Sequence, residues 1–146
     1  MFNIIAIIAL AASLGALQEP ADWRQVDDSG DFHVALDINS ISGPRTARTA
    51  RSVGVSIDPA GLPGYMVLDV VFDCVALTLH ADRATFFALD GSLVQEVDGP
   101  TETAPISEEA GTLVAANAVC DGQMPNGRSF GSAQAYAQSI RAPAGS

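Results

Sequence analysis

The amino-acid sequence predicts an α+β fold, in which an antiparallel meander sheet of about five to six strands carries a helix on one face. Residues 65–74 alternate between an apolar and a mixed face with a period of two, and the apolar face ends in a thiol. Residues 106–120 have helical spacing and end in the second of the two cysteines. The strand spacing and the helix spacing each place one cysteine on a buried face, so both sulfur atoms should point into a common interior. We therefore expect a disulfide between Cys74 and Cys120 that tethers the helix to the sheet.

The chain begins with residues 1–17, an uncharged apolar run that is followed at once by Gln18 and Glu19. The length of this run, and the small residues near its end, are typical of a secretory signal peptide. A membrane-spanning helix needs about 20 apolar residues, so a cleaved signal is the favoured interpretation. The run has no Lys or Arg before it, which leaves a retained anchor as the alternative. No cysteine lies near the cleavage point, which excludes a lipid anchor on a cysteine side chain.

We expect one exported domain over residues 18–141, because 146 residues suit a single domain, followed by a flexible tail at 142–146. The expected location is periplasmic, cell-surface or secreted, with no stable membrane insertion after cleavage of the signal. Two cysteines in an exported chain favour a disulfide over a metal site or a free nucleophile.

The composition is strongly acidic, with a formal net charge of −10 and no lysine among its seven basic residues. Nucleic acid and anionic lipid both require a basic surface, so neither is expected as a partner. Solubility is the simplest explanation of the acidity. The remaining partner classes are another protein and a second copy of this chain.

Strands are expected from the alternation of apolar and polar side chains along the first two-thirds of the chain. Before them, residues 20–30 form a polar entry whose Trp23 is placed to plug one end of the sheet. The expected strands are residues 32–41, about 48–57, 65–74, 84–89 and 92–97. Their short connections and consecutive order predict a meander.

The connections between these strands are marked by turn residues. Residues 75–80 either prolong the central strand past a bulge or begin a new strand, and the sequence leaves both possibilities open. Residues 81–83 are expected to form a tight connection. Asp90 and Gly91 predict a two-residue hairpin with a type I′ turn, which needs positive φ at both central positions.

The first helix is expected to begin after Ser107, which caps it. Glu108 and Glu109 follow in the first turn, where the helix dipole favours anions. Gly122 fits the end of this helix. The stripe that should face the sheet comprises Ala110, Leu113, Val114, Asn117 and Cys120.

A second, short helix is expected to run from a cap at Ser132 to Arg141. Its apolar residues recur at positions i, i+3, i+4 and i+7, the spacing of one helix face. They are Ala133, Tyr136, Ala137 and Ile140.

Constellations of catalytic residues are nearly absent. His33 and Asp37 share a strand face but lie about 13 Å apart by strand rise, so we interpret both as exposed sheet surface. His80 and Asp82 are close enough to touch, yet one imidazole and one carboxylate make neither a zinc site nor a triad. No catalytic residue, metal site or cofactor is therefore expected, and the ligand-binding residues stay unknown.

The remaining charged residues suggest structural roles. Asp73 is expected to bond the backbone rather than to activate Cys74, because a neighbouring carboxylate disfavours a thiolate. Arg45, Arg48 and Arg51 recur every third residue, so on a strand they would be split between its two faces. We interpret them as solvated charges paired with nearby aspartates, and a contact patch for an acidic partner is the alternative.

The order of these features resembles that of the surface-adhesin protein E family of bacterial exported proteins. The resembling pieces lie within residues 23–120: WRQV at 23–26, LDINSI at 36–41, VFDC at 71–74, the Asp90–Gly91 hairpin, and the segment from Ser107 to Cys120. The Phe-Asp-Cys and Val-Cys elements are the most specific. The resemblance implies an antiparallel sheet with a helix held on its concave side by a disulfide, and it makes Cys74 and Cys120 that pair.

Three departures from the family bear on function. Adhesion by its named member relies on basic segments, whereas this chain has no lysine; the lipid anchor is missing; and no Trp precedes the helix at residues 101–106. The expected function is a non-catalytic exported binding module whose ligand is unknown. The alternatives are a structural or inhibitory envelope protein that acts through sheet-edge or dimer contacts, and a small hydrolase that uses His33 or His80.

Overall fold

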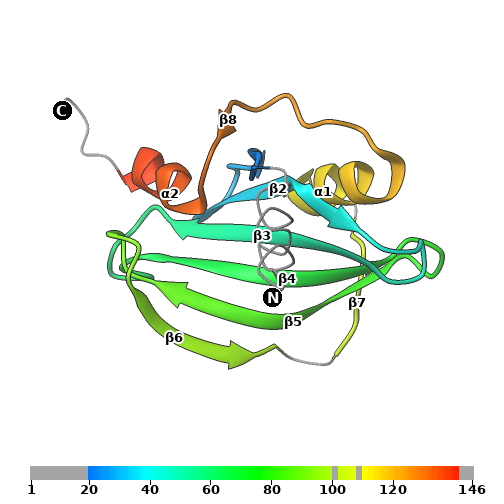
Figure 1. Cartoon of the computed structure of the whole chain (residues 1–146), viewed down its shortest axis with the longest axis horizontal. Coiled ribbons are helices and arrows are strands. Elements are labelled where there is room, and N and C mark those ends of the chain that lie inside the picture. Colours follow the sequence, from blue (N-terminus) through cyan, green and yellow to red (C-terminus); the bar gives the residue numbers. More distant parts are fainter. Residues whose placement is uncertain (1–19, 100–101, 108–109, 142–146) are drawn as a thin grey trace, which may run out of the picture.

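A single antiparallel sheet in meander order forms the centre of the computed structural model, which describes residues 20–99, 102–107 and 110–141. The strands lie in the order β6-β5-β4-β3-β2-β1-β8, and β7 pairs with β5 (Figure 1). The strands are β1 Trp23–Asp27, β2 Phe32–Ser42, β3 Arg48–Ser56, β4 Tyr65–Asp73, β5 Thr78–Phe87, β6 Leu93–Asp98, β7 Ala104–Pro105 and β8 Ser129–Phe130. The helices are α1 Ala110–Asp121 and α2 Ala133–Arg141. The predicted α+β class and the meander sheet are confirmed.

Some predicted features lie outside the described residues. These are the signal segment 1–17, the tail 142–146, and Glu108 and Glu109 in the first turn of the first helix. Within the described part of the chain, neither helix has the length and apolar character needed to cross a bilayer.

The two faces of the sheet bury two separate apolar cores. Along β3, Ala50 belongs to one core, whereas Val53 and Val55 belong to the other, as the period of two requires. The first core packs under α1 and contains Val26, Leu36, Ala50, Val70, Phe72, Cys74, Ala116, Ala118 and Val119. The second packs under α2 and contains Trp23, Ala35, Val53, Val55, Tyr65, Tyr136 and Ala137. The helices thus cover opposite faces, and they lie toward opposite ends of the long strands (Figure 1).

The buried stripe of α1 differs from the predicted one. Leu113 was expected to face the sheet, but it is 42% exposed. The helix instead presents Ala116 and Val119 to the sheet, together with Ala118. Small side chains allow the helix backbone to approach the strands closely, and with Ala116 and Val119 facing the sheet Leu113 lies toward solvent.

The predicted C-terminus of α1 and the predicted N-terminal cap of α2 are confirmed. Gly122 ends α1 with a φ of 69°, and its N–H donates to the carbonyl of Ala118 at 3.2 Å. Ser132 caps α2, because its hydroxyl accepts a hydrogen bond from the N–H of Ala135 at 3.0 Å. Tyr136 and Ala137 of the predicted stripe are buried.

Three predictions for the strands and turns are corrected. Residues 23–27 of the polar entry form the strand β1, because Trp23 and Val26 can enter opposite cores. The expected connection at residues 81–83 lies inside β5, where a bulge accommodates Asp82 between the pairs Val70–Ala81 and Asp69–Arg83. The hairpin at Asp90 is present, but its only positive φ is that of Gly91 at 92°, so the turn is not type I′.

The open question at residues 75–80 is resolved in favour of a new strand. β4 ends at Asp73, a turn follows, and β5 begins at Thr78. The carboxylate of Asp73 accepts hydrogen bonds from the N–H groups of Val75 at 2.9 Å and Ala76 at 2.8 Å. This confirms that Asp73 bonds the backbone, and the turn also places Leu77 at a φ of 59°.

Candidate functional site

The disulfide between Cys74 and Cys120 joins the residue after β4 to the last turn of α1, as predicted. The two Cα atoms lie 5.6 Å apart, a usual separation for a disulfide. Cys74 follows the buried Val70 and Phe72 on one face of its strand, so the bond lies at the edge of the core under α1. Its role is to hold α1 on that face.

Two of the three regularly spaced arginines reinforce this attachment. The guanidinium of Arg45 donates to the carbonyl of Cys120 at 2.9 Å, and that of Arg48 donates to the carbonyl of Val119 at 3.2 Å. The carbonyl of Arg45 also accepts the N–H of Cys74 at 2.8 Å. Cations at a helix C-terminus satisfy unpaired carbonyls and complement the helix dipole. The prediction that these two arginines pair with aspartates is therefore wrong.

Arg51 lies on the opposite face and does pair with an aspartate. Its guanidinium donates to the carboxylate of Asp37 at 2.7 Å, and it stacks 5.5 Å from the ring centre of Trp23. Asp37 is only 2% exposed, so its interpretation as exposed sheet surface is wrong. The side chain is buried because the incoming segment at Asp22 covers it and supplies a donor.

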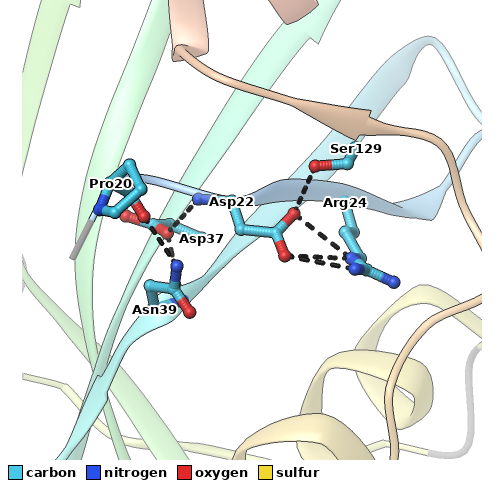
Figure 2. A network of polar contacts seen from close by, with 6 residues as sticks. All are labelled: Pro20, Asp22, Arg24, Asp37, Asn39 and Ser129. Atoms are coloured by element: carbon cyan, nitrogen blue, oxygen red, sulfur yellow. Dashed lines mark hydrogen bonds and ion pairs between the residues drawn. The ribbon is translucent and has the colours of Figure 1, made fainter.

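A polar network joins this buried carboxylate to the first described residues and to Ser129 of β8 (Figure 2). The N–H of Asp22 donates to Asp37 at 2.9 Å, and Asn39 donates to the carbonyl of Pro20 at 2.6 Å. The carboxylate of Asp22 accepts hydrogen bonds from Arg24 at 3.2 Å and from the hydroxyl of Ser129 at 2.6 Å. These bonds, that from Arg24 first, lower the pKa of Asp22 below its usual value. The network fixes β8 and the start of β1 to the sheet.

The face that carries Arg51 presents a row of alternating charges across five strands. The strand register places Asp37 opposite Arg51, Arg51 opposite Asp69, and Asp69 opposite Arg83. Side chains directly opposite in a sheet lie about 5 Å apart at their Cβ atoms, close enough to interact. Arg83 pairs with Glu96 of β6 at 2.9 Å. Among the described residues, Asp69 takes part in no ion pair.

A groove of about 460 Å³ lies along this row, between the sheet and the start of α2. Its aromatic wall includes Tyr65 and Phe87, whose rings stack with centres 5.1 Å apart. Burial, and then the charge of Asp90, raises the pKa of Tyr65, so its phenol stays neutral. The lining residues are Ala21, Trp23, Arg51, Tyr65, Val67, Asp69, Arg83, Thr85, Phe87, Glu96, Gly131, Ser132, Ala133 and Gln134. Guanidinium, carboxylate and aromatic groups therefore meet in one concave surface.

The histidines lie apart from this groove. His80 contacts Asp82 at 3.0 Å, as the sequence allowed, and His33 is half-buried rather than exposed. No hydrogen bond joins His33 to Asp37 in the described part of the chain, and neither histidine lines the groove. The described residues also include no cluster of three side chains suited to bind a metal ion.

Sequence reasoning identified the faces of the strands but missed this groove. Asp37, Arg51 and Asp69 lie opposite one another on neighbouring strands. Their alignment in one row depends on the register between strands, which the sequence alone did not provide. Trp23 was a signal for this region that the sequence contained. A tryptophan between the charged Asp22 and Arg24 is typical of a strand with one buried and one polar face.

Comparison with models of protein families, with curated proteins and with solved structures finds no match to this chain. The resemblance to the surface-adhesin protein E family stays a prediction.

Proposed function

We propose that this chain is a non-catalytic binding module of an exported protein, and that it contacts its partner through the groove beside α2. This is the function that the resemblance to surface-adhesin protein E implies. The observation that most supports it is the row of alternating charges on the groove floor. Arg51 and Arg83 are 49% and 52% exposed at their side chains, so their guanidinium groups are available to a partner.

The chemistry of the groove favours a protein or peptide partner. Alternating positive and negative groups complement a surface that carries both charges, and they discourage a partner that carries only one. Phe87 is half-buried and adds aromatic surface, which is enriched at the centres of protein interfaces, whereas Trp23 and Tyr65 are buried beneath the groove.

The disulfide supports an exported location. Disulfides persist in oxidising compartments and are rare in the cytosol, and this one joins two distant parts of the fold. The expected signal segment at residues 1–17 is consistent with that location. A periplasmic, cell-surface or secreted protein remains the proposal.

A binding panel with matched variants tests this function. The oxidised protein should bind at least one immobilised extracellular-matrix or envelope protein saturably, and Asp69→Arg should weaken that binding at least tenfold. Asp58→Arg, a change in an exposed loop outside the groove, should leave it unchanged. No saturable binding across the panel, or equal losses in the two variants, would contradict the proposal.

A second candidate is self-association through β6, and one observation favours it. β6 is the last strand of the sheet, and its Leu93 and Val94 are 63% and 66% exposed. Exposed apolar side chains on an unpaired edge strand favour the addition of another strand. Light scattering should then report a dimer that Val94→Asp converts to a monomer; a wild-type monomer at all concentrations would remove this candidate.

A further inference from the structure

A second cavity lies on the opposite face of the sheet, between the first half of α1 and the strands. Its volume is about 180 Å³, and seven of its ten lining residues are apolar. Val70, Phe72 and Leu79 form part of the floor, and Ala115 of α1 forms part of the roof. An apolar cavity of about 150 Å³ is large enough to bind benzene in another protein. This one has room for a phenyl ring or a short alkyl chain.

A larger polar cavity adjoins it at Val26 and Asp27, which line both. The polar cavity has a volume of about 440 Å³ and lies between β1, α1 and the loop that contains Met124. Its lining contains Asp27 and Asp28 and several amide side chains, but no arginine or histidine. An apolar slot and an acidic chamber thus meet at Asp27.

The carboxylate of Asp27 is ionised and only partly satisfied within the fold. Its Oδ1 accepts the N–H of Ser29 at 2.9 Å and the hydroxyl of Ser29 at 2.6 Å. These bonds from Ser29 lower the pKa of Asp27. The backbone N–H of Asp28 also bonds this carboxylate and helps to lower its pKa, and the described hydrogen bonds give it no further side-chain donor. The carboxylate of Asp28 accepts only a long bond from Gln25 at 3.4 Å. Both carboxylates therefore have acceptor capacity left for a ligand.

We propose that these adjoining cavities form a binding site for a small cationic amphiphile, with its apolar group under α1 and its ammonium group at Asp27 and Asp28. Charge complementarity selects the head group. His33 lies near Asp27 and helps to lower its pKa, but no arginine or histidine lines either cavity, so the two carboxylates attract an ammonium and repel a carboxylate. The size of the slot selects an apolar group of about six to eight carbon atoms. This site lies on the face opposite the groove, so it does not depend on the proposed function.

Three probes with one phenyl ring and different head groups test the charge preference. They are 2-phenylethylammonium, 2-phenylethanol and 3-phenylpropionate, each titrated calorimetrically into the oxidised protein. The ammonium should bind about tenfold more tightly than the alcohol, the carboxylate should bind weakest, and added salt should narrow the difference. Equal affinities for the three probes, or no saturable binding of any, would overturn the proposal.

Two variants test the position of the site. Asp27→Asn should reduce the affinity for the ammonium to that for the alcohol, whereas Asp31→Asn, an exposed aspartate outside both cavities, should not change it. Ala115→Leu fills the slot and should abolish binding of both the ammonium and the alcohol. Thermal melts verify that each variant folds. Unchanged affinities in Asp27→Asn and Ala115→Leu would show that the probes bind elsewhere and would overturn the assignment.

Discussion

The two helices are held on the sheet in different ways. α2 buries Tyr136 and Ala137 almost completely, and its Arg141 donates to the carbonyl of Leu62 at 2.8 Å. α1 buries only small residues, Ala116, Ala118 and Val119, in its described part. Its C-terminal end is fixed by the disulfide and by Arg45 and Arg48.

The difference is that one helix packs through a large aromatic side chain, and the other combines the packing of small side chains with a covalent bond. A tyrosine buries far more apolar area than an alanine, so α2 gains its stability from packing. α1 packs through several small side chains and has a crosslink near one end. The region of α1 farther from its disulfide lines the apolar slot, and the start of α2 borders the groove on the other face.

Removing the disulfide should have the largest effect. Its cysteines are 46 residues apart in sequence, and the chain-entropy model gives about 4 kcal/mol for closing such a loop. The variant Cys74→Ala with Cys120→Ala should lower the free energy of unfolding in urea by roughly that amount. A loss below about 1 kcal/mol would mean that packing and the two arginines suffice to hold α1.

The two arginines of the charge row should differ in their effect on stability. Arg51→Met leaves Asp37 buried without its cation and should cost about 2 kcal/mol, less than a fully buried pair because Arg51 is half-exposed. Arg83→Met breaks a half-exposed pair with Glu96 and should cost at most about 0.5 kcal/mol. Urea unfolding of both variants makes the comparison. Equal losses of unfolding free energy in the two variants would contradict the inference that the burial of the paired carboxylate sets the cost.

The anchoring of α2 can be examined with a pair of tyrosines. The hydroxyl of Tyr136 donates to the amide oxygen of Gln25 at 2.9 Å, so Tyr136→Phe should cost about 1 kcal/mol. The hydroxyl of Tyr65 has no hydrogen-bond partner among the described residues, so Tyr65 serves as the control. Tyr65→Phe should change the unfolding free energy by less than about 0.5 kcal/mol. The reverse order would argue against the assigned role of Tyr136.

The last prediction concerns stability in acid. The pKa of Asp22 is lowered in the fold, so its contribution is complete above the unfolded pKa of about 3.9 and is lost as the pH falls through the folded value. Asp22→Ala should be less stable than the wild type by about 1 kcal/mol at pH 7. The difference should vanish near pH 2, as followed by urea midpoints across the pH range. A constant difference would exclude the carboxylate as its cause.

Most of the fold could be predicted from the sequence because its signals are local. The alternation in residues 65–74, the cap at Ser132 and the stripe at Tyr136 depend on near neighbours, and the structure confirms all three. The disulfide was also accessible, since two periodicities directed both sulfur atoms inward. The strand β1 was missed because its outer positions are charged and its bulge breaks the alternation.

The candidate site was less accessible because it is assembled across strands. The burial of Asp37 depends on Asp22 and Arg51, which are 15 and 14 residues away. Leu113 was misplaced because apolar spacing alone does not distinguish the stripe at Leu113 from the neighbouring one at Ala116 and Val119. The roles of Arg45 and Arg48 depend on carbonyls more than 70 residues later in the chain. Such long-range relations require the register of the sheet.

Hydrogen exchange of the backbone amides, compared between the wild type and the double variant without cysteines, tests most directly whether the crosslink holds α1 on the sheet. We predict that the amides of α1 lose their protection in the variant, whereas those of α2 and of β2, β3 and β4 keep theirs under native conditions. Unchanged protection in α1, or a loss shared equally by α2, would contradict this account.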